Sequence, residues 1–191
     1  MARKLKVTAV SGGLQRPSRT LALVEHLLDA LAEALPVEAR LIELGPLVPR
    51  FGAVLQRAHL PEDVEAALAA IESAELLVVA SPIYRGSYTG LFKHLFDLVH
   101  QDALIDVPVL LAATGGSERH ALAIDHQLRP LFSFFQANTL PIGVYGVDRD
   151  FVDYRVTSAA LQERIALAVA RAAPLLRQRL GADAARVVQV A

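Results

Sequence analysis

Residues 76–93 read LLVVASPIYRGSYTGLFK. The continuous apolar run over 76–80 is typical of a strand that is buried on both faces, and Ser81-Pro82 ends it. A polar loop then leads into a helix, because leucines recur at helical spacing at Leu91, Leu95 and Leu98. A buried strand followed by a loop and an amphipathic helix is the repeating unit of α/β proteins, so this stretch decides the fold class.

The same unit recurs on both sides of this stretch. Further apolar runs predict strands over residues 4–10, 37–44, 107–113 and 139–145. Apolar residues at helical spacing predict further helices over residues 18–35, 61–71, 118–135 and 157–180. Alternating strands and helices imply parallel strands with helices on both faces. We therefore expect a flavodoxin-like three-layer sandwich with a five-stranded parallel sheet in the order 2-1-3-4-5.

Other segments carry weaker signals. Residues 45–61 show no clear periodicity and are expected to form a connection, as are residues 146–155. Pro130 lies inside the predicted helix over 118–135 and should distort it, because proline has no backbone N–H to donate. The 191 residues suit a single domain. We expect this domain over residues 1–181 and a weakly structured tail over residues 182–191.

The composition excludes several classes of function. There is no cysteine, which rules out disulfides, thiolate metal sites and cysteine nucleophiles. The net charge of −1 comes without a long basic run, so nothing indicates nucleic-acid binding. The apolar runs are too short to cross a membrane and no secretory signal is evident, so a cytoplasmic location is expected. The hydrophobic fraction of 53% is high, and part of it is expected to cover a subunit interface.

The chain also lacks the common catalytic and phosphate-binding motifs. The absence of G-x-x-x-x-G-K-[ST] and of G-x-G-x-x-G disfavours nucleoside-triphosphate hydrolysis and a dinucleotide-binding Rossmann site. The six histidines show no H-E-x-x-H spacing, and no G-x-S-x-G elbow supports a serine hydrolase. No metal site is therefore predicted.

Ligands of such sheets bind beyond the carboxyl ends of the strands, and the first loop there, over residues 11–20, is suited to a phosphate. Ser18 and Thr20 offer hydroxyl groups, and Arg16 or Arg19 offers positive charge. The loop runs into a helix whose free N–H groups and dipole attract an anion. The alternative is that Ser18 only caps this helix.

The loops over residues 81–87 and 114–118 are suited to a flat ring. Tyr84 lies at a strand end, where it can pack against a ring, or it can equally be a surface or interface aromatic residue. Gly115 and Gly116 carry no side chain, so their backbone can approach the polar edge of a ring. The alternative for these glycines is a tight turn.

At these three loops the chain resembles the NADPH-dependent FMN reductase family. The closer resemblance is to the FMN reductases of two-component alkanesulfonate and methanesulfonate monooxygenase systems. It covers about residues 7–154, and SPIYRGSYTGLFK at 81–93 is its most specific segment. The resemblance implies an FMN site formed by Ser11, Arg16, Ser18, Thr20, Pro82, Ile83, Tyr84, Ser87, Thr114, Gly115 and Gly116.

Within that implied site, the hydroxyl groups of Ser18 and Thr20 hold the phosphate. Residues 82–84 line the ribityl chain and the ring, and residues 114–116 meet the pyrimidine side of the ring. A homodimer or homotetramer is also implied, with the flavin near the subunit boundary. In the sulfonate-linked reductases an inserted residue makes a π-bulge, and His126 falls at that point; such bulges often mark functional sites. The alternative is that His126 is an ordinary interface histidine.

The implied reaction is hydride transfer from NADH or NADPH to FMN. The flavin supplies the reactivity and the protein supplies position, so no catalytic side chain is predicted. Reduced FMN would then pass to a flavin-dependent monooxygenase of sulfonate assimilation. The alternatives are an FMN-retaining quinone, azo-dye or metal-ion reductase, a flavodoxin-type electron carrier, and an FMN-binding regulatory module. The net charge of −1 disfavours the electron carrier, because such carriers are usually strongly acidic.

Overall fold

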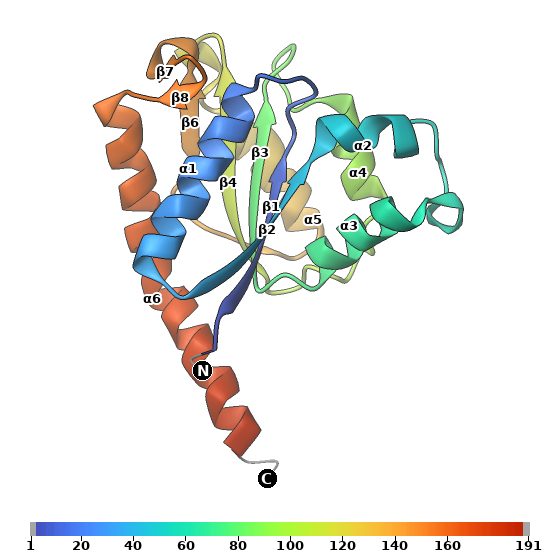
Figure 1. Ribbon diagram of the computed structural model, residues 1–191, viewed down its shortest axis with the longest axis vertical. Coiled ribbons are helices and arrows are strands. Elements are labelled where there is room, and N and C mark those ends of the chain that lie inside the picture. The colour runs from blue at the N-terminus through green and yellow to red at the C-terminus, as the bar shows by residue number, and fades with distance from the viewer. Residues whose placement is uncertain (1–2, 189–191) are drawn as a thin grey trace.

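The computed structural model describes residues 3–188, and for residues 182–188 it describes only the backbone. A parallel sheet in the order β2-β1-β3-β4-β5 carries helices on both faces (Figure 1). Its strands are β1 (Leu5–Ser11), β2 (Val37–Glu43), β3 (Leu76–Pro82), β4 (Pro108–Gly115), β5 (Asn138–Thr139) and β6 (Val144–Val147), which also pairs with β4. The helices are α1 (Arg19–Ala34), α2 (Leu44–Phe51), α3 (Glu62–Glu72), α4 (Gly90–Asp97), α5 (Arg129–Phe134) and α6 (Ala159–Val188). The predicted flavodoxin-like fold and strand order are confirmed.

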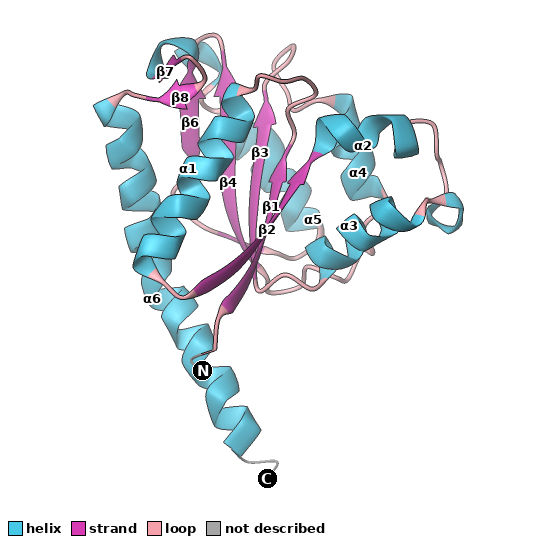
Figure 2. Ribbon diagram, in the orientation of Figure 1, coloured by secondary structure: helices cyan, strands magenta, loops and turns pink. Residues whose placement is uncertain are grey.

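The sheet separates two hydrophobic cores. Along β3, Leu77 and Val79 belong to the core that α2–α5 cover, whereas Val78 and Ala80 belong to the core that α1 and α6 cover. Figure 2 shows the strands in magenta between these two layers of helices. A central strand with helices on both faces must be apolar on both, which explains the continuous run of residues 76–80.

The strands that carry the predicted loops end together at one edge of the sheet. In the parallel register Ser11 of β1 lies beside Ala80 of β3, and Pro82 of β3 lies beside Thr114 of β4. The loops after β1, β3 and β4 therefore start side by side, although they are far apart in the sequence.

Residues 45–61 are not the plain connection that was expected. They include most of α2, and a 3₁₀ turn follows at Arg57–His59. Leu44 and Phe51 are the buried residues of α2, and a helix of eight residues is too short to reveal a helical period. Pro46 occupies its first turn, where a missing N–H costs little.

The single helix expected over residues 118–135 is irregular in its first half and then runs from a π-helix directly into an α-helix. A 3₁₀ turn at Glu118–His120 precedes a π-helix at Ile124–Leu128, and α5 follows. The N–H of Arg129 bonds to a carbonyl five residues back, which is the π-helical pattern. Pro130 lies in the first turn of α5, and the expected distortion of the helix is found directly before it, in the π-helix.

The fifth predicted strand, over residues 139–145, is split into β5 and β6. Pro141 lies between them and cannot donate to the ladder. The carbonyl of Gly143 in this gap accepts a hydrogen bond from Nε of Arg164 on α6 at 2.9 Å. A side chain thus satisfies this carbonyl, whereas the N–H of Leu140 in the same gap still donates to the carbonyl of Val109 on β4 at 2.8 Å.

Residues 146–155, expected to form a loop, contain more structure. A 3₁₀ turn at Asp148–Asp150 leads into β7 (Phe151–Val152), which pairs antiparallel with β8 (Arg155–Val156). Strands of two residues are too short for an alternating pattern to reveal them.

Helix α6 runs from Ala159 to Val188, so its backbone extends into the stretch from residue 182 for which a tail is expected. Residues 189–191 of the predicted tail lie outside the described residues. Within residues 3–188, none of the helices combines the length and apolar character that a bilayer crossing requires.

Candidate functional site

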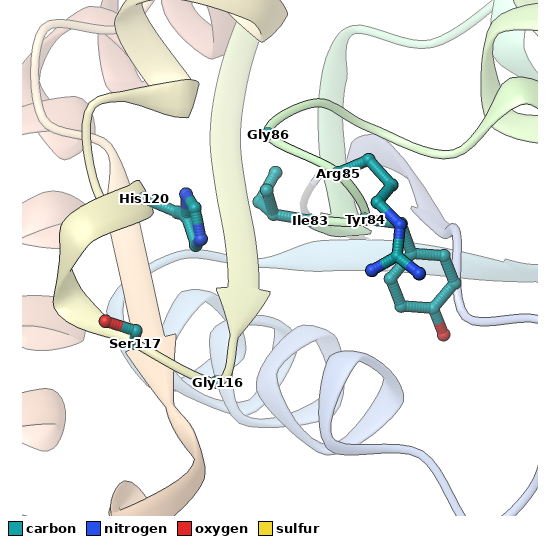
Figure 3. Close-up of a pocket in the computed structure, with 7 residues that line it drawn as sticks. All are labelled: Ile83, Tyr84, Arg85, Gly86, Gly116, Ser117 and His120. Carbon is teal, nitrogen blue, oxygen red and sulfur yellow. The ribbon is translucent and has the colours of Figure 1, made fainter.

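Two cavities open at the edge of the sheet where β1, β3 and β4 end. The helix cavity, of about 290 Å³, lies at the N-terminus of α1. The turn cavity, of about 850 Å³, lies beside the loop after β3 (Figure 3). Ile83, Tyr84 and Gly116 line both cavities, so the two adjoin.

Most of the predicted site residues meet at these cavities. Those that line one or both are Ser18, Thr20, Pro82, Ile83, Tyr84, Thr114, Gly115 and Gly116. The other predicted residues lie elsewhere. Ser11 is buried inside the sheet, and the Ser87 hydroxyl donates to Oε1 of Gln127 on the π-helix at 3.1 Å. His126 is the middle residue of the π-helix, is exposed and lines neither cavity.

The N-terminus of α1 forms the polar end of the helix cavity. Ser18 is the N-cap residue, and its Oγ accepts a hydrogen bond from the N–H of Leu21 at 3.1 Å. Thr20 is buried, with its hydroxyl 2.7 Å from that of Thr114. A Cβ at Gly13 would clash with Oγ of Ser18, so only a bare backbone fits beside the cap. The loop after β1 thus packs tightly around an open helix end, which favours an anion.

Two arginines of this loop have different environments. Arg16 donates from Nε to Glu43 Oε2 at 2.8 Å, is largely exposed and does not line the helix cavity. Arg19 does line it, with Nη1 3.3 Å from Oδ1 of Asp148. Its guanidinium carbon also lies 5.6 Å from the centre of the Tyr154 ring, within cation–π range. Arg19, and not Arg16, is therefore the cation of the cavity.

A tight turn forms one wall of the turn cavity. The N–H of Tyr84 donates to the carbonyl of Ser87 at 2.8 Å, and the two central residues, Arg85 and Gly86, have φ of 54° and 85°. Positive φ at both central positions is the geometry of a type I′ turn. Figure 3 shows Ile83 and His120 facing each other across the cavity, with Tyr84 and Arg85 on the far side of Ile83. The turn holds the ring of Tyr84 57% exposed at the boundary of the two cavities.

The loop after β4 forms the floor between the cavities. A Cβ at Gly115 would clash with the hydroxyl of Tyr145, which donates to the carbonyl of Ser117 at 2.8 Å. Burial raises the pKa of Tyr145, and the nearby charge of Asp148 raises it further, so the phenol stays a donor. A Cβ at Gly116 would meet nothing closer than Oδ2 of Asp148, at 4.0 Å. Gly115 is thus required by packing, whereas Gly116 leaves its backbone open to the cavity.

These residues fit FMN. The helix cavity offers a cation, two hydroxyl groups and a helix N-terminus, which is the donor set that a phosphate needs. The turn cavity offers Ile83, Tyr84 and the open backbone of Gly116, which suit a flat ring with one polar edge. Among the described residues, no cluster of histidine and carboxylate side chains is arranged to hold a metal ion.

Sequence reasoning missed part of this site. Asp148 and Tyr154 line the helix cavity, and Tyr145 supports the loop after β4. They come from β6 and the segment after it, where the pattern showed only a strand end and a loop. No sequence signal marked them, because they reach the site through the split fifth strand and the short β7–β8 pair.

Comparison with known proteins places this site in a family. The profile of the NADPH-dependent FMN reductase family matches residues 5–152. A protein of Pseudomonas fluorescens (strain Pf0-1) named NADH-dependent FMN reductase SfnF is 63% identical over 180 residues, covering 94% of this chain and 96% of that protein. The Pseudomonas putida protein named NADH-dependent FMN reductase SfnE is 62% identical over 175 residues, covering 92% and 94%. A Pseudomonas aeruginosa protein named FMN reductase (NADPH) is 60% identical over 179 residues, covering 94% and 96%.

Solved structures agree with this assignment. An oxidoreductase from Corynebacterium diphtheriae superposes with a TM-score of 0.82 at 35% identity, covering 92% of this chain and 98% of that one. The apo form of the NADH:FMN oxidoreductase EmoB superposes with a TM-score of 0.78 at 28% identity, covering 89% of both chains. With matching loops, matching fold and close relatives across nearly its whole length, the chain belongs to the NADPH-dependent FMN reductase family, whose members reduce FMN with a nicotinamide cofactor.

Proposed function

We propose that this FMN reductase prefers NADH and releases reduced FMN to a separate flavin-dependent monooxygenase of sulfonate assimilation. The two relatives of highest quoted identity are named NADH-dependent, which supports the choice of donor. The observation that carries the proposal is the pair of adjoining cavities, one charged and one largely apolar. FMN has the same division, with a dianionic phosphate at one end and a flat ring at the other.

We propose that the helix cavity holds the phosphate. The N-terminus of α1 contributes its dipole, and Arg19 contributes a full positive charge. The hydroxyl of Ser18 already accepts a hydrogen bond from the helix, but a hydroxyl has one proton and two lone pairs, so it can still donate to a phosphate oxygen. Capping and phosphate binding are therefore compatible roles for Ser18.

We propose that the turn cavity holds the ring. Ile83 and the ring of Tyr84 present apolar surface that excludes water from one side, and Gly116 lets the backbone approach the polar edge. When bound, FMN accepts a hydride from the nicotinamide, and this chemistry is the flavin's own. The protein orients the two rings and needs no acid or base of its own for that step.

The open character of the site supports release. The Tyr84 ring is more than half exposed, and the side chains of Arg19 and Asp148 are 41% and 56% exposed. A ligand held by such groups keeps contact with water and dissociates more readily than one enclosed in a core. A cytoplasmic location is part of the proposal, since nicotinamide donors are regenerated inside the cell.

We also propose that the chain forms a homodimer or homotetramer. Phe134 is 68% exposed and borders a cavity between α4 and α5 that Tyr88, Phe96 and Leu131 also line. An exposed phenylalanine beside further apolar residues supports a subunit contact there. His126, exposed on the π-helix, is proposed to act in assembly or in flavin handover. Light scattering of the purified protein, with and without His126→Ala, tests the oligomeric state and the role of His126 in assembly.

The central test is a titration of the purified chain with FMN, riboflavin and FAD, followed by quenching of the flavin fluorescence. Tighter binding of FMN than of riboflavin is expected, because riboflavin lacks the phosphate. Oxidation of NADH should be more efficient than that of NADPH with FMN present, and gel filtration after turnover should separate flavin from protein. If the protein does not bind FMN, the assignment of the two cavities to the phosphate and the ring is contradicted. If FMN stays bound to the protein through gel filtration, the proposed release of reduced FMN is contradicted.

A further inference from the structure

The helix cavity contains a carboxylate as well as a cation. Asp148 follows β6 directly and lines the cavity together with Ser18, Arg19 and Thr20. Its Oδ1 lies 3.3 Å from Nη1 of Arg19. A negative charge at this point repels a phosphate and neutralises the cation that would attract one. An anion site built only for tight binding would not contain it.

The position of Asp148 is well defined by its neighbours. The N–H of Val147 donates to Oδ2 of Asp150 at 2.8 Å, and the N–H of Thr157 donates to the carbonyl of Asp150 at 2.9 Å. Arg149 forms an ion pair with Glu118 in the segment after β4. The 3₁₀ turn is thus tied at both ends, and Asp148 is held beside the cavity by its backbone.

Arg19 is held between Asp148 and an aromatic ring. Tyr154 follows Asp153 in the turn between β7 and β8, and both have positive φ, 58° and 48°. Positive φ is uncommon outside glycine, and here it orients the Tyr154 ring toward the guanidinium of Arg19. Two groups from outside the three loops that were predicted to bind a ligand therefore hold the cation of the cavity in place.

We propose that Asp148 and the flavin phosphate compete for Arg19, and that this competition weakens FMN binding. The inference rests on the proposed function, because it takes the helix cavity as the phosphate site. In the free protein Arg19 is paired with Asp148. A phosphate must share or displace that carboxylate, so part of its own attraction to Arg19 is lost.

The test compares Asp148→Asn with the wild type in FMN and riboflavin titrations. Asparagine keeps the shape and removes the charge, so FMN should bind about fivefold more tightly, the scale expected for a half-exposed charge pair. Riboflavin carries no phosphate, and its affinity should not change. Asp153→Asn is the matched control, since it removes the same charge from the same segment, lines neither cavity, and asparagine tolerates positive φ.

A second background tests the competition itself. In Arg19→Gln protein the further change Asp148→Asn should give a smaller gain in FMN affinity, because it then relieves only the direct repulsion between the carboxylate and the phosphate and no longer frees a contested cation. Unchanged FMN affinity in Asp148→Asn, an equal gain for riboflavin, an equal gain in Asp153→Asn, or a full gain without Arg19 would each overturn the inference. Failure of the wild type to prefer FMN over riboflavin would instead reject the proposed phosphate site, so the two failures are distinguishable.

Discussion

The helix cavity and the turn cavity share a boundary but differ in chemistry. The helix cavity has charges of both signs and hydroxyl groups, and it draws on α1 and on the segment after β6. The turn cavity is formed by Ile83, Tyr84 and glycine backbone, and the basic residues among its described lining are Arg85 and His120. If FMN binds as proposed, this difference means that the protein recognises the phosphate and the ring of the flavin independently. A change in the helix cavity should affect the binding of FMN alone, because riboflavin has no phosphate. A change at the boundary of the two cavities should affect the binding of FMN and of riboflavin together.

The largest effect on FMN affinity is expected from the double variant Ser18→Ala/Thr20→Ala, which removes two hydroxyl groups from the helix cavity and leaves the turn cavity unchanged. Each hydroxyl that bonds to a charged phosphate contributes roughly 1.5–3 kcal/mol, so FMN affinity should fall by about a hundredfold or more. Fluorescence titration measures the loss. Riboflavin affinity should stay close to that of the wild type, and an equal loss for both flavins would show that the change damages the fold instead of the phosphate site.

The next effect is expected at the boundary, from Gly115→Ala. The new Cβ clashes with the hydroxyl of Tyr145 and should displace the loop between the cavities, lowering affinity for FMN and riboflavin alike by roughly tenfold. The double variant Gly115→Ala/Tyr145→Phe removes the clashing hydroxyl and leaves the ring carbon at 3.3 Å, so binding should largely recover. Gly90→Ala is the control, because a Cβ there meets nothing within 4 Å. If Gly115→Ala lowers flavin affinity and the added Tyr145→Phe does not restore it, the packing role of Gly115 is contradicted.

A smaller effect separates the two arginines of the first loop. Arg19→Gln should weaken FMN binding about fivefold, since its half-exposed charge lies in the cavity. Arg16→Gln should leave FMN binding unchanged, because Arg16 pairs with Glu43 outside the cavity. The same fluorescence titration measures both variants. A larger loss of FMN affinity in Arg16→Gln than in Arg19→Gln would show that Arg16 binds the phosphate.

The smallest effect concerns stability at high pH. The pKa of Tyr145 is raised in the folded protein. Its contribution to the free energy of unfolding is therefore fully present below the ordinary phenol pKa of about 10, and it is lost as the pH rises through the raised value. Urea unfolding between neutral pH and pH about 11 should therefore show a decline in stability that is shallower in Tyr145→Phe. Identical pH profiles in the two proteins would mean that Tyr145 is not held in its neutral form by the fold.

The fold and the three loops were predictable because their signals are local and strong. A run such as residues 76–80 has to be buried on both faces, and the loops after buried strands must meet at one edge of a parallel sheet. Glycine at 115 and 116 was identified as a place of close backbone approach, although the two reasons differ. Gly115 avoids Tyr145, whereas Gly116 borders open space.

The remaining features depend on long-range contacts that no local pattern encodes. Arg16 and Arg19 lie three positions apart in one loop, and only the positions of Glu43 and Asp148 decide which of them faces the cavity. Pro130 indicates that the helix is distorted, but the apolar spacing does not show that the distortion is a π-helix over Ile124–Leu128. Asp148 and Tyr154 depend on the β7–β8 pair, whose strands are too short to be seen in the sequence.

The β7–β8 hairpin has a further consequence. Phe151 anchors it in the core, whereas Asp153 and Tyr154 lie at its exposed turn. Exchanging the turn residues leaves the buried anchor and the parallel sheet untouched. The hairpin is therefore a natural place for protein engineering, because substitution of Tyr154, whose ring lies beside Arg19, changes the surroundings of the cation of the helix cavity and leaves the core unchanged.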